Sequence, residues 1–356
     1  MSGVHQLLVS ATDGDAVSSA TFEAQRVLAQ VGPSKIVSRY MAPSVTSRVV
    51  GLRNAYVETD PMDPFIFHGS IGQAEVHRFV ESHPGPTILQ YHNITPSSFF
   101  VEHDPVFAQI LDQGRSEIAR MRHRFDAAWA DSSFSADELT HMGFQNVAVC
   151  PLIIDTATLT AAPDHVPLVN HLATEDGPVL LFVGQLLPHK RPDLLIQAFH
   201  LLVSHHLPHA RLILVGPHRN PTYQRAIVDL VRELGLSRCW VAGELSTSEL
   251  ATMYRHATAF VTASEHEGFC VPLVEAMAFG VPIVASARAA IPETLGAGGL
   301  LLPADAGPQL WCEAMLAVCT DARVRADLQR ASTARGAAFA PDHARRTLVE
   351  RLSEAL

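Results

Sequence analysis

Two glutamates and the residues around them have the types and spacing to do chemistry. Glu267 and Glu275 lie on either side of a Gly-Phe-Cys-Val-Pro turn in SEHEGFCVPLVEAMAFGVPIV, residues 264–284. The segment is typical of a strand end, a loop and a helix, and Pro272 suits the first position of that helix. The backbone N–H groups of residues 268–271 would then point out of a helix N-terminus, where anions bind.

These residue types fit one kind of ligand. Phosphate is attracted to the helix N-terminus, whereas a carboxylate accepts hydrogen bonds from hydroxyl groups. A diphosphate flanked by hydroxyls is a nucleotide sugar, so one glutamate would bind the ribose and the other the transferred sugar. The segment alone is equally compatible with an ordinary loop charge at Glu267 and an exposed helical residue at Glu275.

The composition is that of a water-soluble globular protein. The chain has 356 residues, which favours two domains, and 47% of them are apolar. It contains no run of about 18 uncharged apolar residues, and its start lacks the basic region of a signal peptide, so we expect a cytoplasmic protein. The net charge of −10 argues against nucleic-acid binding. Five cysteines without CxxC spacing indicate free thiols, and the histidine-rich segment 200–209 is interpreted as solvated surface, so no metal is expected.

The second half alternates short apolar strands with amphipathic helices, which predicts a parallel sheet covered on both faces. The expected strands are 179–184, 211–216, 239–243, 259–264 and 282–286. The first half repeats the pattern less clearly. Its expected strands are HQLLVSA, PFIFHGS, TILQYHNI and AAWADS, with helices near 16–31, 73–82, 105–124 and 135–142.

We therefore predict an α/β fold of two Rossmann-like, doubly wound domains that face each other across a cleft. The predicted N-terminal domain, 1–155, binds the acceptor, and the helix 340–356 packs back on it. Residues 156–178 form a linker, and 179–339 form the nucleotide-sugar-binding domain. Ligands bind such sheets at the carboxyl ends of the strands.

At this point the chain resembles a known family. The E-x7-E spacing of Glu267 and Glu275 is similar to the signature of retaining glycosyltransferases of the GT-B fold, in the large family numbered four. The resemblance extends to 182–199, a phosphate-binding strand–loop–helix, to the base loop AGELSTSEL, and to 289–302. It is strong over 179–302 and weaker in the first half, where YHNITPSSFF and TDGDAVSSATFEAQ resemble family segments.

The resemblance implies roles for individual residues. Glu275 would bind the ribose, and Glu267 a hydroxyl of the donor sugar. Lys190 would neutralise the leaving diphosphate, and His92 would face the anomeric centre; a histidine that merely caps a strand end is the alternative. The other implied donor-binding residues are Gly184, Gln185, Arg191, Leu245, Gly268, Phe269, Cys270 and Val271, and the acceptor-binding ones are Gly14, Asp15 and Arg115.

Two departures from the family pattern are visible. Gln185 stands where the family usually has arginine, which removes a cation from the diphosphate site, and Arg191 is the candidate to compensate. The first loop contains Asp13-Gly14-Asp15 instead of a Gly-Gly pair. A metal-binding DxD is not favoured there, since the nucleotide signals lie in the second half; Asp15 either caps the next helix or contacts an acceptor hydroxyl.

The implied reaction is transfer of a hexose from an NDP-sugar with retention at the anomeric carbon, by front-face substitution without a metal cofactor. UDP is slightly favoured over GDP, although Glu244 and Glu249 in the base loop leave GDP open. The acceptor is a glycan, a lipid-linked molecule or a small molecule. Arg115, Arg120, Arg122 and Arg124 are candidates to meet it at a membrane surface, with Gly114–Arg115 interpreted as a ligand-facing turn; a solvated helix is the alternative.

Other readings of the sequence remain. A sugar-nucleotide epimerase, or a nucleotide-binding module with little catalysis, would use the same fold. A dehydrogenase is disfavoured because no GxGxxG follows a first strand. A homodimer and peripheral contact with the inner face of the membrane are further predictions, and glycan or polysaccharide biosynthesis is the expected setting.

Overall fold

The computed structural model describes residues 3–174, 176–217 and 220–356. The chain divides into two compact units, which we call unit 1 (Met1–Asp155 with Ala340–Leu356) and unit 2 (Thr156–Phe339). Residues 156–178, expected as a linker, carry helices α6 (Ala157–Ala161) and α7 (Val166–Ala173) and belong to unit 2.

Unit 1 is built on a seven-stranded parallel sheet with the order β3-β2-β1-β4-β5-β6-β7. Its strands are β1 (His5–Ala11), β2 (Ile36–Met41), β3 (Val49–Gly51), β4 (Phe65–Gly69), β5 (Thr87–Tyr91), β6 (Ala127–Ala130) and β7 (Ala148–Val149). Its helices are α1 (Ala16–Val31), α2 (Ala55–Glu58), α3 (Ala74–Ser82), α4 (Pro105–Arg120), α5 (Ser133–His141) and α15 (Pro341–Ala355).

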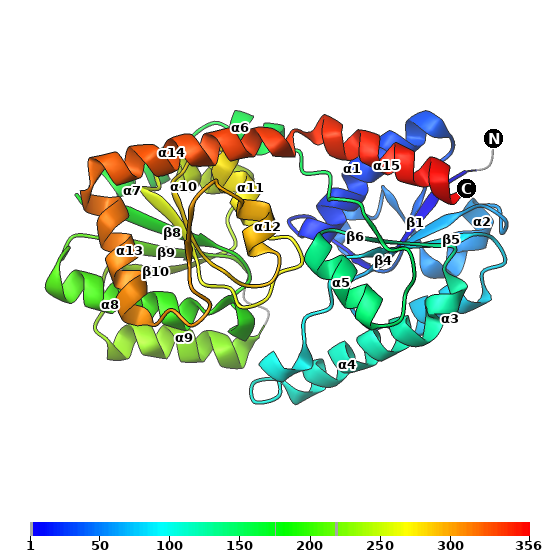
Figure 1. Cartoon of the computed structure of the whole chain (residues 1–356), viewed down its shortest axis with the longest axis horizontal. Helices are drawn as coiled ribbons and strands as arrows, with labels where there is room; N and C mark the ends of the chain where they lie inside the picture. The colour runs from blue at the N-terminus through cyan, green and yellow to red at the C-terminus, as the bar shows by residue number, and fades with distance from the viewer. Residues whose placement is uncertain (1–2, 175, 218–219) are drawn as a thin grey trace. The chain divides into compact units, whose positions relative to one another are not determined.

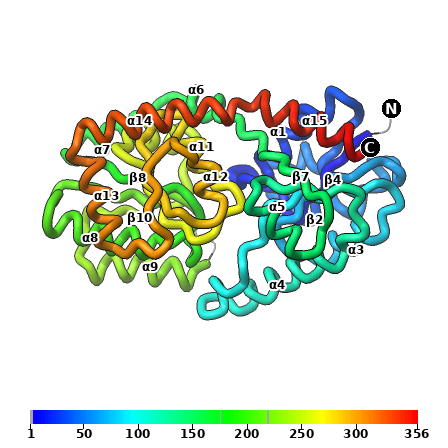
Figure 2. Tube along the Cα trace, in the orientation of Figure 1, coloured from blue at the N-terminus to red at the C-terminus, as the bar shows by residue number. Residues whose placement is uncertain are grey.

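The C-terminal helix α15 lies beside α1 in unit 1 (Figures 1 and 2). Its apolar positions recur every four residues, as an amphipathic helix requires. Ala344, Leu348 and Leu352 are buried in the same core as Leu28 and Trp129. The chain therefore returns to its first sheet to complete that core.

Unit 2 is built on a six-stranded parallel sheet with the order β10-β9-β8-β11-β12-β13. Its strands are β8 (Val179–Val183), β9 (Arg211–Val215), β10 (Cys239–Gly243), β11 (Ala259–Thr262), β12 (Ile283–Ser286) and β13 (Leu300–Leu302). Besides α6 and α7, its helices are α8 (Pro192–His205), α9 (Pro221–Glu233), α10 (Thr247–His256), α11 (Val271–Ala278), α12 (Ile291–Leu295), α13 (Pro308–Thr320) and α14 (Ala322–Gly336).

Helices cover both faces of the unit 2 sheet, with α8 and α9 on one side and α10 and α11 on the other (Figure 1). Side chains of α8, α9 and α13 form one buried cluster with the sheet, and those of α10, α11 and α12 form a second. The central strands β8 and β9 are buried and almost entirely apolar, with the sequences VLLFV and RLILV. The prediction of two doubly wound parallel sheets is confirmed.

The order of each sheet reverses direction once, between β1 and β4 in unit 1 and between β8 and β11 in unit 2. In doubly wound sheets, ligands bind outside the carboxyl ends of the strands at such a switch point. The loops after these strands are therefore where a ligand is expected to bind.

Candidate functional site

The loops after β8 and β11 are held together at the switch point of unit 2. The backbone N–H of Glu265 donates to the carbonyl of His189 at 2.7 Å, which joins the two loops directly. His189 is buried, and burial, with the neighbouring charges of Lys190 and His266, lowers the pKa of its ring well below the ordinary value. This ring therefore stays neutral at physiological pH, and the cations of the loop are the two residues that follow it, Lys190 and Arg191.

Lys190 and Glu267, predicted from sequence as functional residues, meet across these loops. The Lys190 Nζ lies 2.6 Å from Glu267 Oε1, and the two side chains are 18% and 10% exposed. The thiol of Cys270 also hydrogen-bonds to the Glu267 carboxylate, and burial raises the pKa of that thiol well above its usual range. The thiol is therefore a hydrogen-bond donor and not a nucleophilic thiolate.

The backbone of the turn into α11 has an uncommon conformation. Cys270, the N-cap of α11, is left-handed with φ of 73°, which is uncommon for a residue with a side chain. The carbonyl of Phe269 accepts from Thr294 Oγ1 at 2.6 Å, which fixes the peptide before it. The turn comprises Gly268, Phe269, Cys270 and Val271, the residues predicted to face phosphate and sugar oxygens.

Glu275 lies one turn inside α11, and its Oε2 accepts a hydrogen bond of 2.7 Å from the buried Tyr254 hydroxyl. Burial raises the pKa of the Glu275 carboxyl, and the Tyr254 hydrogen bond partly opposes that rise. Burial also raises the pKa of Tyr254, so the phenol keeps its proton and remains the donor. Tyr254 therefore occupies one of the two carboxylate oxygens of Glu275.

Arg191, the candidate to compensate for Gln185, is bound to acidic side chains. Its guanidinium contacts Asp193 at 3.1 Å and also pairs with Glu265. Arg191 itself is left-handed, with φ of 51°, at the start of α8. These two ion pairs fix the loop, and Lys190 is the cation that pairs with Glu267.

The remaining predicted donor residues also lie at this edge of the sheet. Gly184 and Gln185 follow β8 directly and are half-buried. A Cβ on Gly216 would lie 1.9 Å from the Gly184 carbonyl oxygen, so the ends of β8 and β9 approach closely. Leu245 packs against the second buried cluster of unit 2. Glu249, considered as a base contact, instead forms a capping box with Ser246.

The first loop of unit 1 uses its two aspartates separately. Asp15 caps α1, accepting from the backbone N–H and the hydroxyl of Ser18 at 3.0 Å each. Gly14 is left-handed, with φ of 76°. Asp13 pairs with Arg48 at 2.8 Å. The capping interpretation of Asp15 is confirmed, while its contact with an acceptor stays a prediction.

His92 lies at the carboxyl end of β5, as the strand pattern predicted, but its ring is enclosed. Its Nδ1 lies 2.9 Å from Asp131 Oδ2 and its Nε2 lies 2.7 Å from His68 Nδ1. The side chains of His92 and Asp131 are each 2% exposed. Both ring nitrogens are therefore engaged within unit 1 in this structure.

Arg115 anchors the loop after β5. It donates to Glu138 Oε1 and to the carbonyl of Ile94, each at 2.6 Å, and the Tyr91 hydroxyl donates to Glu138 Oε2 at 2.6 Å. The predicted ligand-facing turn at Gly114–Arg115 is wrong, because both residues lie inside α4. The glycine is needed because a Cβ there would lie 2.5 Å from the backbone nitrogen of Gly72.

The other arginines of this basic segment have partners of their own. Arg120 pairs with Glu81 at 3.1 Å, and Arg124 donates to the carbonyls of His83 and Gly85. Arg122 is exposed and donates to the carbonyl of Ala119 at 3.0 Å. Contact of this segment with an acceptor or a membrane stays a prediction.

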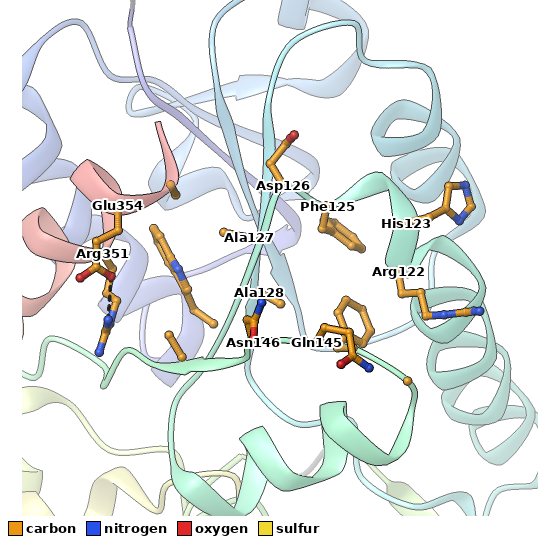
Figure 3. Close-up of a pocket in the computed structure, with 15 residues that line it drawn as sticks. Arg122, His123, Phe125, Asp126, Ala127, Ala128, Gln145, Asn146, Arg351 and Glu354 are labelled. Carbon is orange, nitrogen blue, oxygen red and sulfur yellow. Dashed lines mark hydrogen bonds and ion pairs between the residues drawn. The ribbon is translucent and has the colours of Figure 1, made fainter.

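A hollow of about 510 Å³ in unit 1 lies away from the carboxyl edge of the sheet (Figure 3). It is bounded by the start of β6 at Asp126 and Ala127 and by the end of α15. Arg122 and His123 lie on one side of it, and Arg351 and Glu354 on the other, without converging. Its size alone does not make it a site, and the loops described above have the converging groups.

Within residues 3–174, 176–217 and 220–356, no three His, Cys, Asp or Glu side chains are grouped so that they could hold a metal ion. In the same part of the chain, no helix combines the length and apolarity needed to cross a bilayer.

Three residues that contact the predicted site were not found from sequence: Tyr254, His68 and Asp131. Tyr254 lies in the amphipathic helix α10, where a buried tyrosine is expected as part of the core and does not indicate a site. His68 ends a strand that carries no motif. Only the polar residues at the ends of β4 and β6 could have pointed to His68 and Asp131.

Part of the chain is similar in sequence to a known protein family, and its fold is similar to solved structures. Residues 169–335 match the family model described as Glycosyl transferases group 1. Over the whole fold, 99% of the chain superposes on sucrose-phosphate synthase from Thermosynechococcus elongatus, covering 98% of that chain with a TM-score of 0.78 and 17% identity. It also superposes on Anabaena HepE in complex with UDP-glucose, covering 99% of each chain with a TM-score of 0.80 and 16% identity.

Sequence relatives agree over part of the chain. A D-inositol 3-phosphate glycosyltransferase of Kineococcus radiotolerans is 35% identical over 192 residues, which cover 49% of this chain and 44% of that protein. A lipopolysaccharide 1,2-N-acetylglucosaminetransferase of Salmonella typhimurium is 34% identical over 126 residues, covering 33% and 32%. The chain thus spans less than half the length of these relatives.

The fold is GT-B, the architecture of the glycosyltransferases that it superposes on. The match to the glycosyl transferases group 1 family model covers residues 169–335, somewhat less than half of the chain.

Proposed function

We propose that the protein is a retaining glycosyltransferase of the family numbered four. It transfers a hexose from a nucleotide sugar, UDP favoured over GDP, to a sugar, lipid-linked or small-molecule acceptor. The observation that carries this proposal is the Lys190–Glu267 ion pair at the switch point of unit 2, beside the left-handed turn into α11. Its setting in glycan or polysaccharide biosynthesis follows from relatives named for inositol phosphate and lipopolysaccharide transfer.

The charges of the site suggest how the donor binds. Lys190 and Arg191 lie among the carboxylates of Asp193, Glu265 and Glu267. A diphosphate adds further negative charge, so its binding requires a cation to change partners. Lys190 is that cation, since its ammonium has three donors and a flexible stem.

We infer that Lys190 moves from Glu267 to the diphosphate when the donor binds. This exchange frees a Glu267 oxygen, which then accepts a hydrogen bond from a hydroxyl of the donor sugar. Glu275 takes the ribose hydroxyls with the oxygen that Tyr254 does not use. The amides at the start of α11 contribute their partial positive charge to the phosphate.

The chemistry follows from these positions. As the bond from the anomeric carbon to the diphosphate breaks, negative charge grows on the diphosphate, and Lys190 stabilises it. The acceptor hydroxyl attacks from the same face, and its proton passes to the departing phosphate oxygen. Glu267 and Glu275 are occupied in binding, so neither serves as the nucleophile of a double displacement.

UDP is favoured because HepE, whose fold this chain shares, is known in complex with UDP-glucose. The acidic residue considered for guanine, Glu249, is engaged in its capping box. The experiment is release of nucleoside diphosphate from UDP-, GDP-, ADP- and dTDP-glucose, with inositol phosphate or lipopolysaccharide as acceptor, and NMR of the product anomer. We expect turnover of UDP-glucose with an α-linked product; no release from any donor, or a β-linked product, would contradict the proposal.

A further inference from the structure

A row of buried polar side chains crosses the sheet of unit 1 and is not explained by the transfer reaction. It runs from Gln6 in β1 through His68 in β4 and His92 after β5 to Asp131 after β6. The bonds measure 3.0 Å from Gln6 to His68, 2.7 Å from His68 to His92 and 2.9 Å from His92 to Asp131. All four residues are buried.

The direction of these hydrogen bonds is fixed at the Gln6 end. The Gln6 Nε2 donates to the carbonyl of Thr21 at 3.1 Å, which turns Oε1 toward His68. The His68 Nε2 must therefore carry a proton and donate. Burial lowers the pKa of His68 well below the ordinary value, so the ring is neutral and its Nδ1 has only a lone pair to offer.

His92 must then donate to that lone pair. The two imidazole planes differ by 3° with centroids 5.0 Å apart, while the facing nitrogens are only 2.7 Å apart. The rings therefore meet edge to edge in one plane and are not stacked face to face. In this geometry an N–H of His92 Nε2 points along the lone pair of His68 Nδ1.

The direction is also fixed at the Asp131 end. The Gln90 Nε2 donates to Asp131 Oδ1 at 2.7 Å and to the carbonyl of Cys150 at 3.0 Å. Asp131 is thus an acceptor on that side, as a carboxylate is. A second donor, the Nδ1 of His92, faces its other oxygen.

We propose that His68 is a positioning residue that holds His92 as a doubly protonated imidazolium, paired with the carboxylate of Asp131. The neutral His68 supplies the acceptor that the second proton of His92 needs. For catalysis this inference rests on the proposed function: it fixes a positive charge at the carboxyl end of β5, the edge at which a doubly wound domain binds its ligand.

The test uses protein with 15N-labelled histidine rings at pH 7. Long-range proton–nitrogen correlations distinguish protonated from bare ring nitrogens. For the wild type, we expect two protonated nitrogens on His92 and one on His68. His68→Phe should leave His92 with one protonated nitrogen, and His68→Asn should restore both, because the asparagine Oδ1 can take the place of Nδ1. A wild-type His92 with a bare nitrogen would overturn the proposal.

The variants have a matched control. A cavity of about 30 Å³ adjoins His68 and His92 and gives room for the phenyl ring. His83, which is as buried as His68, binds Tyr56 and the carbonyl of Asp63 and lies outside the row. His83→Phe should leave the His92 spectrum unchanged, and melting temperatures check that each variant folds.

Kinetics give a second reading. With an active donor and acceptor, His68→Phe should lower kcat at least about tenfold without changing the donor KM, since a charge in the transition state is lost. His68→Asn should recover it, and an equal effect of His83→Phe would contradict a positioning role. If the wild type transfers no sugar, the proposed function fails, while the spectra still decide the protonation of His92.

Discussion

The carboxyl edges of the two sheets carry polar residues in very different states. In unit 1, His92 and Asp131 are each 2% exposed and bind each other, and further hydrogen bonds join His92 to His68 and Asp131 to Gln90. In unit 2, Lys190 and Glu267 are 18% and 10% exposed and pair across two loops. A closed network of this kind resists change, because each lost partner leaves a buried polar group unpaired.

An ion pair between loops can instead exchange one partner for a ligand at lower cost. We therefore assign positioning to the polar residues of unit 1 and direct ligand contact to those of unit 2. This division of roles between the two units has consequences that single substitutions can test.

Replacing Lys190 should produce the largest effect. Lys190→Met should lower the transfer rate about 10²- to 10³-fold, as when one preorganised charge is removed from a reaction centre. Steady-state kinetics measure this, with Lys35→Met as the control. Lys35 is the other lysine of the chain and pairs with Glu58 at 3.6 Å on the surface. Equal rates for the two variants would contradict the assignment of ligand contact to Lys190.

Replacing Glu267 should separate binding from transfer. Glu267→Gln weakens its hold on Lys190, so we expect UDP to bind several-fold more tightly while transfer falls. Isothermal titration calorimetry and kinetics on the same preparation give both numbers, with the exposed Glu244→Gln as the control. Weaker UDP binding would show that Lys190 does not change partners.

Replacing Glu275 should weaken the binding of the nucleotide. Loss of hydrogen bonds from a carboxylate to ribose hydroxyls costs about 1.5–3 kcal/mol, or roughly 10- to 150-fold in affinity. Glu275→Ala should show this loss by calorimetry, whereas Glu313→Ala, on an exposed helix face, should not. An unchanged UDP affinity would show that Glu275 does not bind the ribose.

Replacing Arg115 should affect stability and not nucleotide binding. Arg115→Met leaves Glu138 with only Tyr91 and the Ile94 carbonyl without its donor, at a cost of about 1–3 kcal/mol. Thermal melts should show a lower Tm with unchanged UDP affinity. Arg122→Met removes only one exposed bond to Ala119 and should melt like the wild type. A large loss of UDP affinity in Arg115→Met would contradict the division.

The smallest expected effect is a dependence of stability on pH, and both units should contribute to it. Burial lowers the pKa of His68 and His189 well below the histidine value of about 6.5. Below that pH, the unfolded chain binds protons that the folded chain does not, so the free energy of unfolding falls as pH falls. Each histidine contributes a slope of up to about 1.4 kcal/mol per pH unit.

Melts between pH 7 and pH 5 measure this slope. His68→Asn and His189→Asn should each reduce the loss of Tm on acidification. The exposed His256→Asn should not alter it. A wild-type Tm that is constant over this range would contradict the neutral state of both rings.

The sequence predicted the scaffold better than the site. Helix 16–31 was predicted with its observed bounds, because its periodic apolar face begins directly after the capping residue Asp15. The strands β2, β3, β7 and β13 were missed, since the last three are only two or three residues long. Lys190 and Glu267 were predicted individually, and their ion pair was not, because the two residues are 77 positions apart in sequence and only the pairing of β8 with β11 brings their loops together.

The same limit applies to unit 1. His92 was predicted, but its partners come from β4 and from the residue after β6, which no local pattern connects. Arg115 was assigned to a ligand because the Gly-Arg pair suggested a turn. The helix continues through Gly114, since Gly72 packs against it.

The most direct test uses the fact that the chain has two lysines, Lys35 in unit 1 and Lys190 in unit 2. Reductive methylation with 13C-formaldehyde labels them and the α-amino group, and Lys35→Met assigns the spectrum. On titration with UDP, we expect a saturable shift of the Lys190 signal and no shift of Lys35, and the Lys190 shift in Glu275→Ala should need roughly 10- to 150-fold more UDP. If the Lys190 signal stays in place at saturating UDP, GDP, ADP and dTDP, the nucleotide does not bind beside Lys190, and the proposed donor site is wrong.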